Sequence, residues 1–204
     1  MAAPTEDPRV VQPGHAQTPF TADEIREGCP AGRTIGMLVE PPDADPFVTI
    51  NRFVTVDDEG ADHETESLTM EGESMDSPAQ MRTRWKEFQA HASFSAEQTE
   101  IVSEVLETPM GALQCRRYTV TDGPTSDTYW FAMDKPGMPV KVETVGPGGG
   151  TAARGHQDLE SDAISAIDAG MSKHGSNASS TAPARESVTA ATFKTQNGMD
   201  TQTI

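Results

Sequence analysis

The stretch from Leu113 to Val145 constrains the fold most, because it holds three β-type runs separated by two turn signals. Its first run, Leu113–Thr121, is rich in residues that suit the pleated, half-buried surface of a strand. Asp122-Gly123-Pro124 ends this run, and Pro136-Gly137 is the typical sequence of a type II turn. Short turns between such runs predict an antiparallel meander.

The middle run of this stretch, Thr128–Met133, is apolar on both faces of the expected strand. Tyr129 and Phe131 alternate with Trp130, and successive side chains of a strand point to opposite faces. A strand that is apolar on both sides is covered on both sides. We therefore place the hydrophobic core in this stretch, with Met138 opening a further period-two run after the turn.

The remaining segments predict two helices and more strands. Thr21 and Glu24 form a capping box, the pattern that begins a helix. A second capping pattern starts at Ser77, and an apolar stripe through Trp85 follows it, so we expect a second helix as far as His91. Further β-type runs cover residues 33–39, 47–56, 63–70 and 99–106, and the acidic run 63–70 suits the edge of a sheet.

The predicted fold class is α+β, with the elements in the order α-βββ-α-ββββ. The connections between runs are too short for crossover helices, so the strands should pair antiparallel. We therefore expect a single, mainly antiparallel, strongly bent β-sheet of six to seven strands with two helices, followed by a flexible C-terminal tail.

An internal echo relates the two halves of the expected domain. Residues 52–57, RFVTVD, resemble residues 117–122, RYTVTD, at an offset of 65. The same offset carries the first expected helix onto the end of the second and Thr34 onto Thr99. Two interpretations stay open: a true two-fold repeat, or a chance match between β-rich segments.

The expected element order also resembles that of a known family. A curved sheet wrapped around a helix is similar to the lipoprotein-carrier (LolA-like) family and related single-sheet binding folds. The resemblance implies a binding function. Members of that family are exported, whereas the first residues of this sequence, MAAPTEDPRVVQPGH, carry no export signal.

Composition divides the chain into three parts. At Gly146 the sequence changes from β-type alternation to a segment dominated by Gly, Ser, Thr and Ala. Such a segment buries too little apolar surface to offset roughly 1–2 kcal/mol of backbone entropy per ordered residue. We predict a flexible N-terminal arm at 1–17, a single α+β domain at 18–145 and a low-complexity, disordered tail at 146–204.

Charge limits the partners of the chain. It carries 32 acidic and 15 basic residues, a formal net charge of −17, and the segment from Asp57 to Asp76 holds no Lys or Arg. Such a surface repels phosphate backbones and anionic membranes, which excludes nucleic acid as an expected partner. No apolar run approaches the roughly 18–20 residues that span a bilayer, so we expect no membrane insertion and a cytoplasmic location.

The leading hypothesis is a non-enzymatic binding or interaction domain with no cofactor and no metal. Aromatic and Met side chains on a curved sheet suit an apolar or amphipathic ligand, or a segment of a partner protein. The candidate ligand-binding residues, expected on the concave face of the sheet, are Trp85, Tyr118, Trp130, Phe131 and Met138.

Two alternatives from other classes stay open. One is an enzyme whose site assembles only in space, around Cys115, which has two arginines beside it, or His91. No zinc-ligand spacing, nucleophile elbow or phosphate-binding loop accompanies these residues. The other is a structural or assembly protein, in which case the acidic surface serves oligomerisation. The sequence leaves the oligomeric state undecided.

Overall fold

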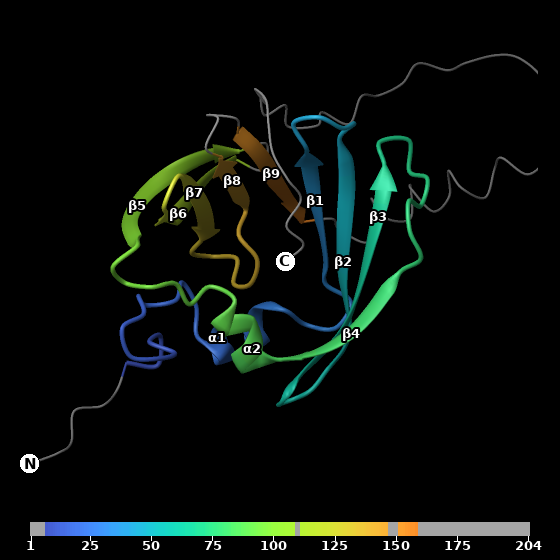
Figure 1. Ribbon diagram of the computed structural model, residues 1–204. Helices are drawn as coiled ribbons and strands as arrows, with labels where there is room; N and C mark the ends of the chain where they lie inside the picture. Colours follow the sequence, from blue (N-terminus) through green and yellow to red (C-terminus); the bar gives the residue numbers. More distant parts are fainter. Residues whose placement is uncertain (1–6, 109–110, 147–150, 159–204) are drawn as a thin grey trace, which may run out of the picture.

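The computed structural model describes residues 7–108, 111–146 and 151–158, the last of these as backbone alone. Two short helices and nine strands follow one another in this part of the chain (Figure 1). The helices are α1 (Ala22–Gly28) and α2 (Trp85–Ala90). The strands are β1 (Thr34–Glu40), β2 (Phe47–Val56), β3 (Gly60–Thr69), β4 (Ala79–Arg84), β5 (Thr99–Thr108), β6 (Gly111–Asp122), β7 (Thr125–Ala132), β8 (Lys141–Val145) and β9 (Thr151–Asp158).

The strands form two antiparallel sheets of four strands each, ordered β4-β3-β2-β1 and β8-β7-β6-β5. β9 pairs antiparallel with β1 on one side and with β8 on the other, so it joins the two sheets along their inner edges (Figure 1). The α+β class and the antiparallel pairing are confirmed. The prediction of one sheet of six or seven strands is wrong, because eight strands form two sheets of four, and β9, from the range predicted as tail, joins them into an order of nine.

The second predicted helix is half strand. Only Trp85–Ala90 is helical, and the preceding residues form β4, which pairs with β3 from Gly60↔Arg84 to Thr65↔Ala79. A Cβ at Gly60 would collide with the backbone of β4, so this close approach requires glycine. Pairing with β3 satisfies the backbone of 79–84 and outweighs the local capping pattern at Ser77.

The first predicted helix is confirmed together with its capping box. The Thr21 hydroxyl accepts a hydrogen bond from the Glu24 amide, and the Glu24 carboxylate accepts one from the Thr21 amide. The helix ends at Gly28, with Cys29 as its C-terminal cap.

The two halves of the chain share one element order, which supports the repeat interpretation. Each half consists of a helix followed by four strands, α1-β1-β2-β3-β4 and α2-β5-β6-β7-β8. The offset of 65 carries the first residue of β1, Thr34, onto the first residue of β5, Thr99, and Gly60 at the start of β3 onto Thr125 at the start of β7. The short match between residues 52–57 and 117–122 therefore marks equivalent strands, β2 and β6.

The main hydrophobic core draws on both halves, not on the 113–145 stretch alone. Strands of the first half contribute Ile35, Met37 and Phe53, and those of the second contribute Tyr118 and Phe131. α1 and α2 contact each other and lie together in Figure 1, below β5–β8 and beside β4 of the other sheet. The core therefore lies where the two sheets and the helix pair meet.

The aromatic residues at the start of each helix pack against the sheet of the other half. Trp85, at the start of α2, stacks on Phe53 of β2 with ring centroids 6.5 Å apart. Phe20, just before α1, meets Phe131 of β7 edge-to-face at 6.3 Å. Phe20 and Trp85 are themselves separated by 65 residues, so the exchange is reciprocal. The two halves share one core and are not independent domains.

Segments outside the predicted domain make defined backbone contacts. Within the predicted arm, the Ala16 amide donates to the Phe94 carbonyl at 2.9 Å, and His15 bridges to Ser95. β9 lies within the range predicted as tail. The remainder of that predicted tail, residues 159–204, lies outside the described residues. None of the helices in the described ranges is long and apolar enough to cross a membrane.

Candidate functional site

Four of the five candidate ligand-binding residues belong to the main core. Trp85, Tyr118 and Phe131 are buried members of the main cluster, and Met138 packs against it partly buried. Trp130 is buried in a second cluster instead. The structure therefore gathers four of the predicted residues and separates the fifth from them.

Strand alternation explains the separation of Trp130 from Phe131. The two residues are neighbours on β7, so their side chains point to opposite faces of the sheet. The Trp130 indole donates to the Glu104 carboxylate at 2.6 Å, and the Lys141 ammonium lies 4.7 Å from the ring centroid. The other buried members of this second cluster are Leu113, Cys115, Ala132 and Val140.

The aromatic rings of the main core pack on one another. Tyr118 and Phe131 meet edge-to-face at 5.5 Å, and Tyr129 stacks on Phe94 at 5.0 Å. The Tyr118 hydroxyl donates to the Gln17 carbonyl at 2.9 Å, which satisfies its polar atom. Burial raises the pKa of this hydroxyl, although the charge of Arg116 opposes the shift. The packed rings therefore fill the core instead of presenting a surface to a ligand.

The two residues considered for an enzyme lie in different surroundings. Cys115 is buried in the second cluster, and burial raises its pKa to about 11, reinforced by Asp134 and Glu104. Its thiol is therefore protonated near neutral pH, whereas catalytic cysteines react as thiolates. His91 caps the C-terminal end of α2 and lies 6.2 Å from the ring of Phe88.

A second histidine, His63, also lies beside Phe88, and the sequence interpretation did not single it out. Its ring is 5.4 Å from Phe88, and its Nε2 is hydrogen-bonded to the Thr83 hydroxyl at 2.9 Å. Burial lowers the pKa of the imidazole, an effect that Asp62 opposes and His91 reinforces. Thr83 was assigned to a helix in the sequence prediction, which hid this pairing.

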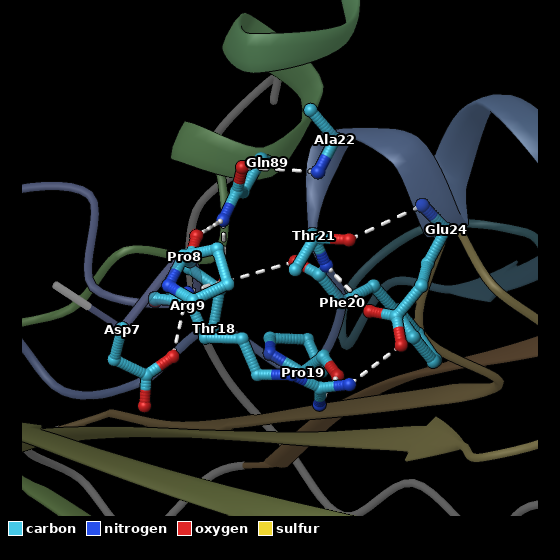
Figure 2. Close-up of polar contacts among 10 residues, drawn as sticks. All are labelled: Asp7, Pro8, Arg9, Thr18, Pro19, Phe20, Thr21, Ala22, Glu24 and Gln89. Carbon is cyan, nitrogen blue, oxygen red and sulfur yellow. Dashed lines mark hydrogen bonds and ion pairs between the residues drawn. The ribbon is translucent and has the colours of Figure 1, made fainter. Parts of the chain in front are cut away.

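Gln89 of α2 joins three segments through its buried amide (Figure 2). Its nitrogen donates to the Pro8 carbonyl at 2.8 Å and to the Thr18 hydroxyl at 3.1 Å. Its oxygen accepts from the Ala22 amide of α1 at 3.0 Å. One side chain thus fastens the N-terminal segment to both helices.

Arg9 fastens the same segment to α1 (Figure 2). Its guanidinium donates to the Pro19 carbonyl at 2.7 Å and forms a 2.6 Å ion pair with Glu24. Because the contacts of Gln89 and Arg9 are all internal to the protein, we assign this network a structural role. Across the described residues, no group of three or more His, Cys, Asp or Glu side chains is arranged to hold a metal ion.

Exposed apolar side chains mark the two outermost strands. Met81 of β4 is 61% exposed, and on β5 Ile101 is 41% and Val105 is 52% exposed. β4 also carries two exposed arginines, Arg82 and Arg84. The sequence interpretation missed this surface because it assigned 79–84 to a helix. The period-two alternation of Met81 and Thr83 with the arginines is the signal that could have found it.

No protein-family model matches the sequence, and no curated protein sequence matches it significantly.

Proposed function

We propose that this protein is a non-enzymatic interaction domain that binds an extended segment of a partner protein along the free edge of β5. The observation that carries the proposal is the pair of half-exposed apolar side chains, Ile101 and Val105, on a ten-residue edge strand. Within the described ranges β5 pairs only with β6, so one side of its backbone is open.

The backbone of such an edge is a template for an added strand. An edge strand presents unpaired N–H and C=O groups, and an extended peptide can hydrogen-bond to them as a further strand of the sheet. Natural edges are usually short, twisted or protected by charged side chains, lysine above all. β5 is long, and its only charged residues are the acidic Glu100, Glu104 and Glu107. These features favour a bound strand at this position.

The side chains of β5 define the partner chemistry. Ile101 and Val105 alternate with Ser103 on one face, which suits a partner segment with apolar residues at every second position. Glu100 is exposed on the other face, and Glu107 is exposed as well. The partner segment should therefore combine alternating apolar residues with Lys or Arg.

The apolar-ligand form of the hypothesis is the weaker one. A ligand that contacted Trp85, Tyr118, Phe131 and Met138 would have to separate rings that pack on one another. A partner strand at β5 leaves the core intact. The enzymatic alternative has less support, since Cys115 is buried and protonated. The net charge of −17 argues against nucleic acid, and the cytoplasmic location stays a prediction.

Selection of short peptides against the full chain tests the proposal. From a displayed library of random ten-residue peptides, we expect binders with alternating apolar and basic residues. Binding of these peptides should slow amide exchange in β5, and Val105→Lys should abolish the binding. Val54→Lys is the matched control, because Val54 is 47% exposed but lies on β2, inside the sheet.

Two results would contradict the proposal. One is the protection of amides away from β5 by the selected peptides. The other is that the protein selects no peptide but its tryptophan fluorescence responds to amphiphiles, and Val105→Lys leaves this response unchanged. The second result would restore the apolar-ligand hypothesis.

A further inference from the structure

We infer that residues 187–195 of this chain bind along the free edge of β5 as an added antiparallel strand, and that a partner segment must displace them to reach this edge. The inference rests on the proposed function and adds its regulation, because the edge then has an occupant from within the chain. The segment, SVTAATFKT, lies outside the described residues, and its sequence matches the side chains of the described edge.

Residues 187–195 are the most strand-like run that follows β9. Three threonines, a valine and a phenylalanine make up more than half of the run, and these residue types favour strands. Pro183 precedes the run and Asn197-Gly198 follows it, so turn residues bound it on both sides. Phe193 is the only aromatic residue among 159–204. The run therefore has the length and the residue types of one added strand.

The charge around this run complements β5. Residues 171–204 hold three basic and two acidic side chains, although the whole chain is strongly acidic, and Arg185 and Lys194 lie at the two ends of the run. β5 carries three glutamates and no Lys or Arg. β4, the other end of the strand order, carries the exposed Arg82 and Arg84. Since opposite charges stabilise a strand pair and like charges destabilise it, charge directs the run to β5 and not to β4.

One antiparallel register matches the apolar and the charged residues together. With Phe193 opposite Ile101, Lys194 lies opposite Glu100, because antiparallel partners advance in opposite directions. Ile101 also pairs with Tyr118 of the main core, so Phe193 would extend the apolar side chains on that face of the sheet. Lys194 and Glu100 would attract each other on the opposite face.

The remaining pairs of this register are also favourable. Val188 lies opposite Leu106, which packs partly buried against the second cluster. Arg185 lies diagonally across from Glu107, within reach of a long side chain. No two charges of the same sign lie directly opposite each other. The run thus supplies the combination of apolar and basic residues that suits the β5 edge.

The chain that follows β9 is long enough for this contact. The 28 residues of 159–186 separate the end of β9 from the run. At about 3.3–3.6 Å per residue they can span roughly 90–100 Å. The added strand would lie five strand spacings from β9, about 24 Å at about 4.8 Å each. Tethering therefore makes the contact intramolecular, at an effective concentration on the order of 1 mM.

Hydrogen exchange of the full chain, read by mass spectrometry of its proteolytic fragments, tests the inference. A synthetic peptide of residues 185–196 gives the exchange rates of the unbound run. A strand tethered at about 1 mM that binds with a dissociation constant of about 0.1 mM is protected about tenfold. We therefore expect the amides of 187–195 to exchange about tenfold more slowly in the chain than in the peptide.

Substitutions at the two central pairs test the register. Phe193→Asp should remove the protection of 187–195 and speed exchange along β5. Lys194→Glu and Glu100→Lys should each lower the protection severalfold, because the attraction between opposite charges becomes a repulsion. The double variant K194E/E100K should restore the protection.

Lys173→Glu is the matched control, because it makes the same charge change outside the run. It should leave exchange unchanged, and circular dichroism should show every variant folded. Full-chain rates for 187–195 that equal those of the free peptide overturn the inference. So does protection that Lys173→Glu lowers as much as Lys194→Glu, which indicates general attraction to the acidic surface. Protection that rises with protein concentration overturns binding within one chain and indicates β5 of a second copy as the site.

The failure of this inference can be told apart from the failure of the proposed function. Selected peptides that protect β5 in a chain whose 187–195 amides are unprotected refute the run as occupant and leave the interaction domain standing. Protected 187–195 amides in a chain that selects no peptide, even as Phe193→Asp, refute the partner and leave the run in place. If both hold, selected peptides should bind Phe193→Asp about tenfold more tightly than the unchanged chain, because the tethered competitor is gone.

Discussion

The two halves of the molecule share an element order but differ in the register of one strand pair. In the second half, β6 and β7 pair without interruption from Asp122↔Thr125 to Cys115↔Ala132. In the first half, the pairing of β2 with β3 shifts between Phe53 and Thr55, which leaves Val54 as an extra residue. A single extra residue of this kind is a β-bulge, and it exchanges the faces of the strand beyond it.

This bulge decides which side chains the two halves bury. The residues of β3 equivalent to Tyr129 and Phe131 of β7 are Glu64 and Glu66. The shift turns the glutamates away from the core face, so that Glu64 forms an ion pair with Arg52, and it turns His63 toward Phe53 and Phe88. The comparison shows that a repeated fold can place acidic residues at positions equivalent to core residues of the other half, when a bulge changes the register.

Truncation at the equivalent core positions Phe53 and Tyr118 should have the largest effect. Phe53→Ala and Tyr118→Ala should each lower the free energy of unfolding by about 3–5 kcal/mol. Since the aromatic residues of each helix pack on the other half, both variants should unfold in one transition seen equally by fluorescence and circular dichroism. Two separate transitions would show that the halves are independent domains.

The equivalent helix positions Glu24 and Gln89 provide a smaller test. Both side chains hold the N-terminal segment, but the Gln89 amide is buried and Glu24 is partly exposed. Gln89→Leu leaves buried polar groups unpaired and should cost about 1–3 kcal/mol. Glu24→Gln keeps an acceptor for the Thr21 amide and should cost about 1 kcal/mol or less, the worth of a surface ion pair. If both variants lose the same free energy of unfolding in urea, other contacts hold the N-terminal segment.

The smallest expected effect is a pH dependence confined to the first half. Burial lowers the pKa of His63, and its equivalent in the second half, Thr128, does not titrate. A histidine with a lowered folded-state pKa binds its proton more tightly when unfolded. The stability that neutral His63 contributes is therefore lost as the pH falls through its unfolded-state pKa of about 6.5 toward its lower folded-state pKa. Between pH 7.5 and pH 5.5 the unchanged protein should lose more stability than His63→Gln. An equal loss in both would remove His63 as the cause.

The candidate site was less predictable from the sequence than the fold. Period-two patterns identified β5, β6 and β7, and apolar residues on both faces of β7 correctly indicated burial of Trp130 and Phe131. Period-two patterns do not reveal which side chains of distant strands share a face of the sheet. The exposure of Met81, Ile101 and Val105 could not be predicted either, because it depends on β4 and β5 lying at the two ends of the strand order.

The amino-acid sequence by itself determined the features that depend on a few neighbouring residues. These are the capping box at Thr21, the antiparallel strands of the second half and the offset of 65 between the halves. Only the tertiary structure decided what depends on distant partners. The pairing with β3 made residues 79–84 a strand, and the bulge at Val54 chose the face of β3. The physical reason is that backbone hydrogen bonds between strands and burial in a shared core outweigh local preferences, which amount to less than about 1 kcal/mol per residue.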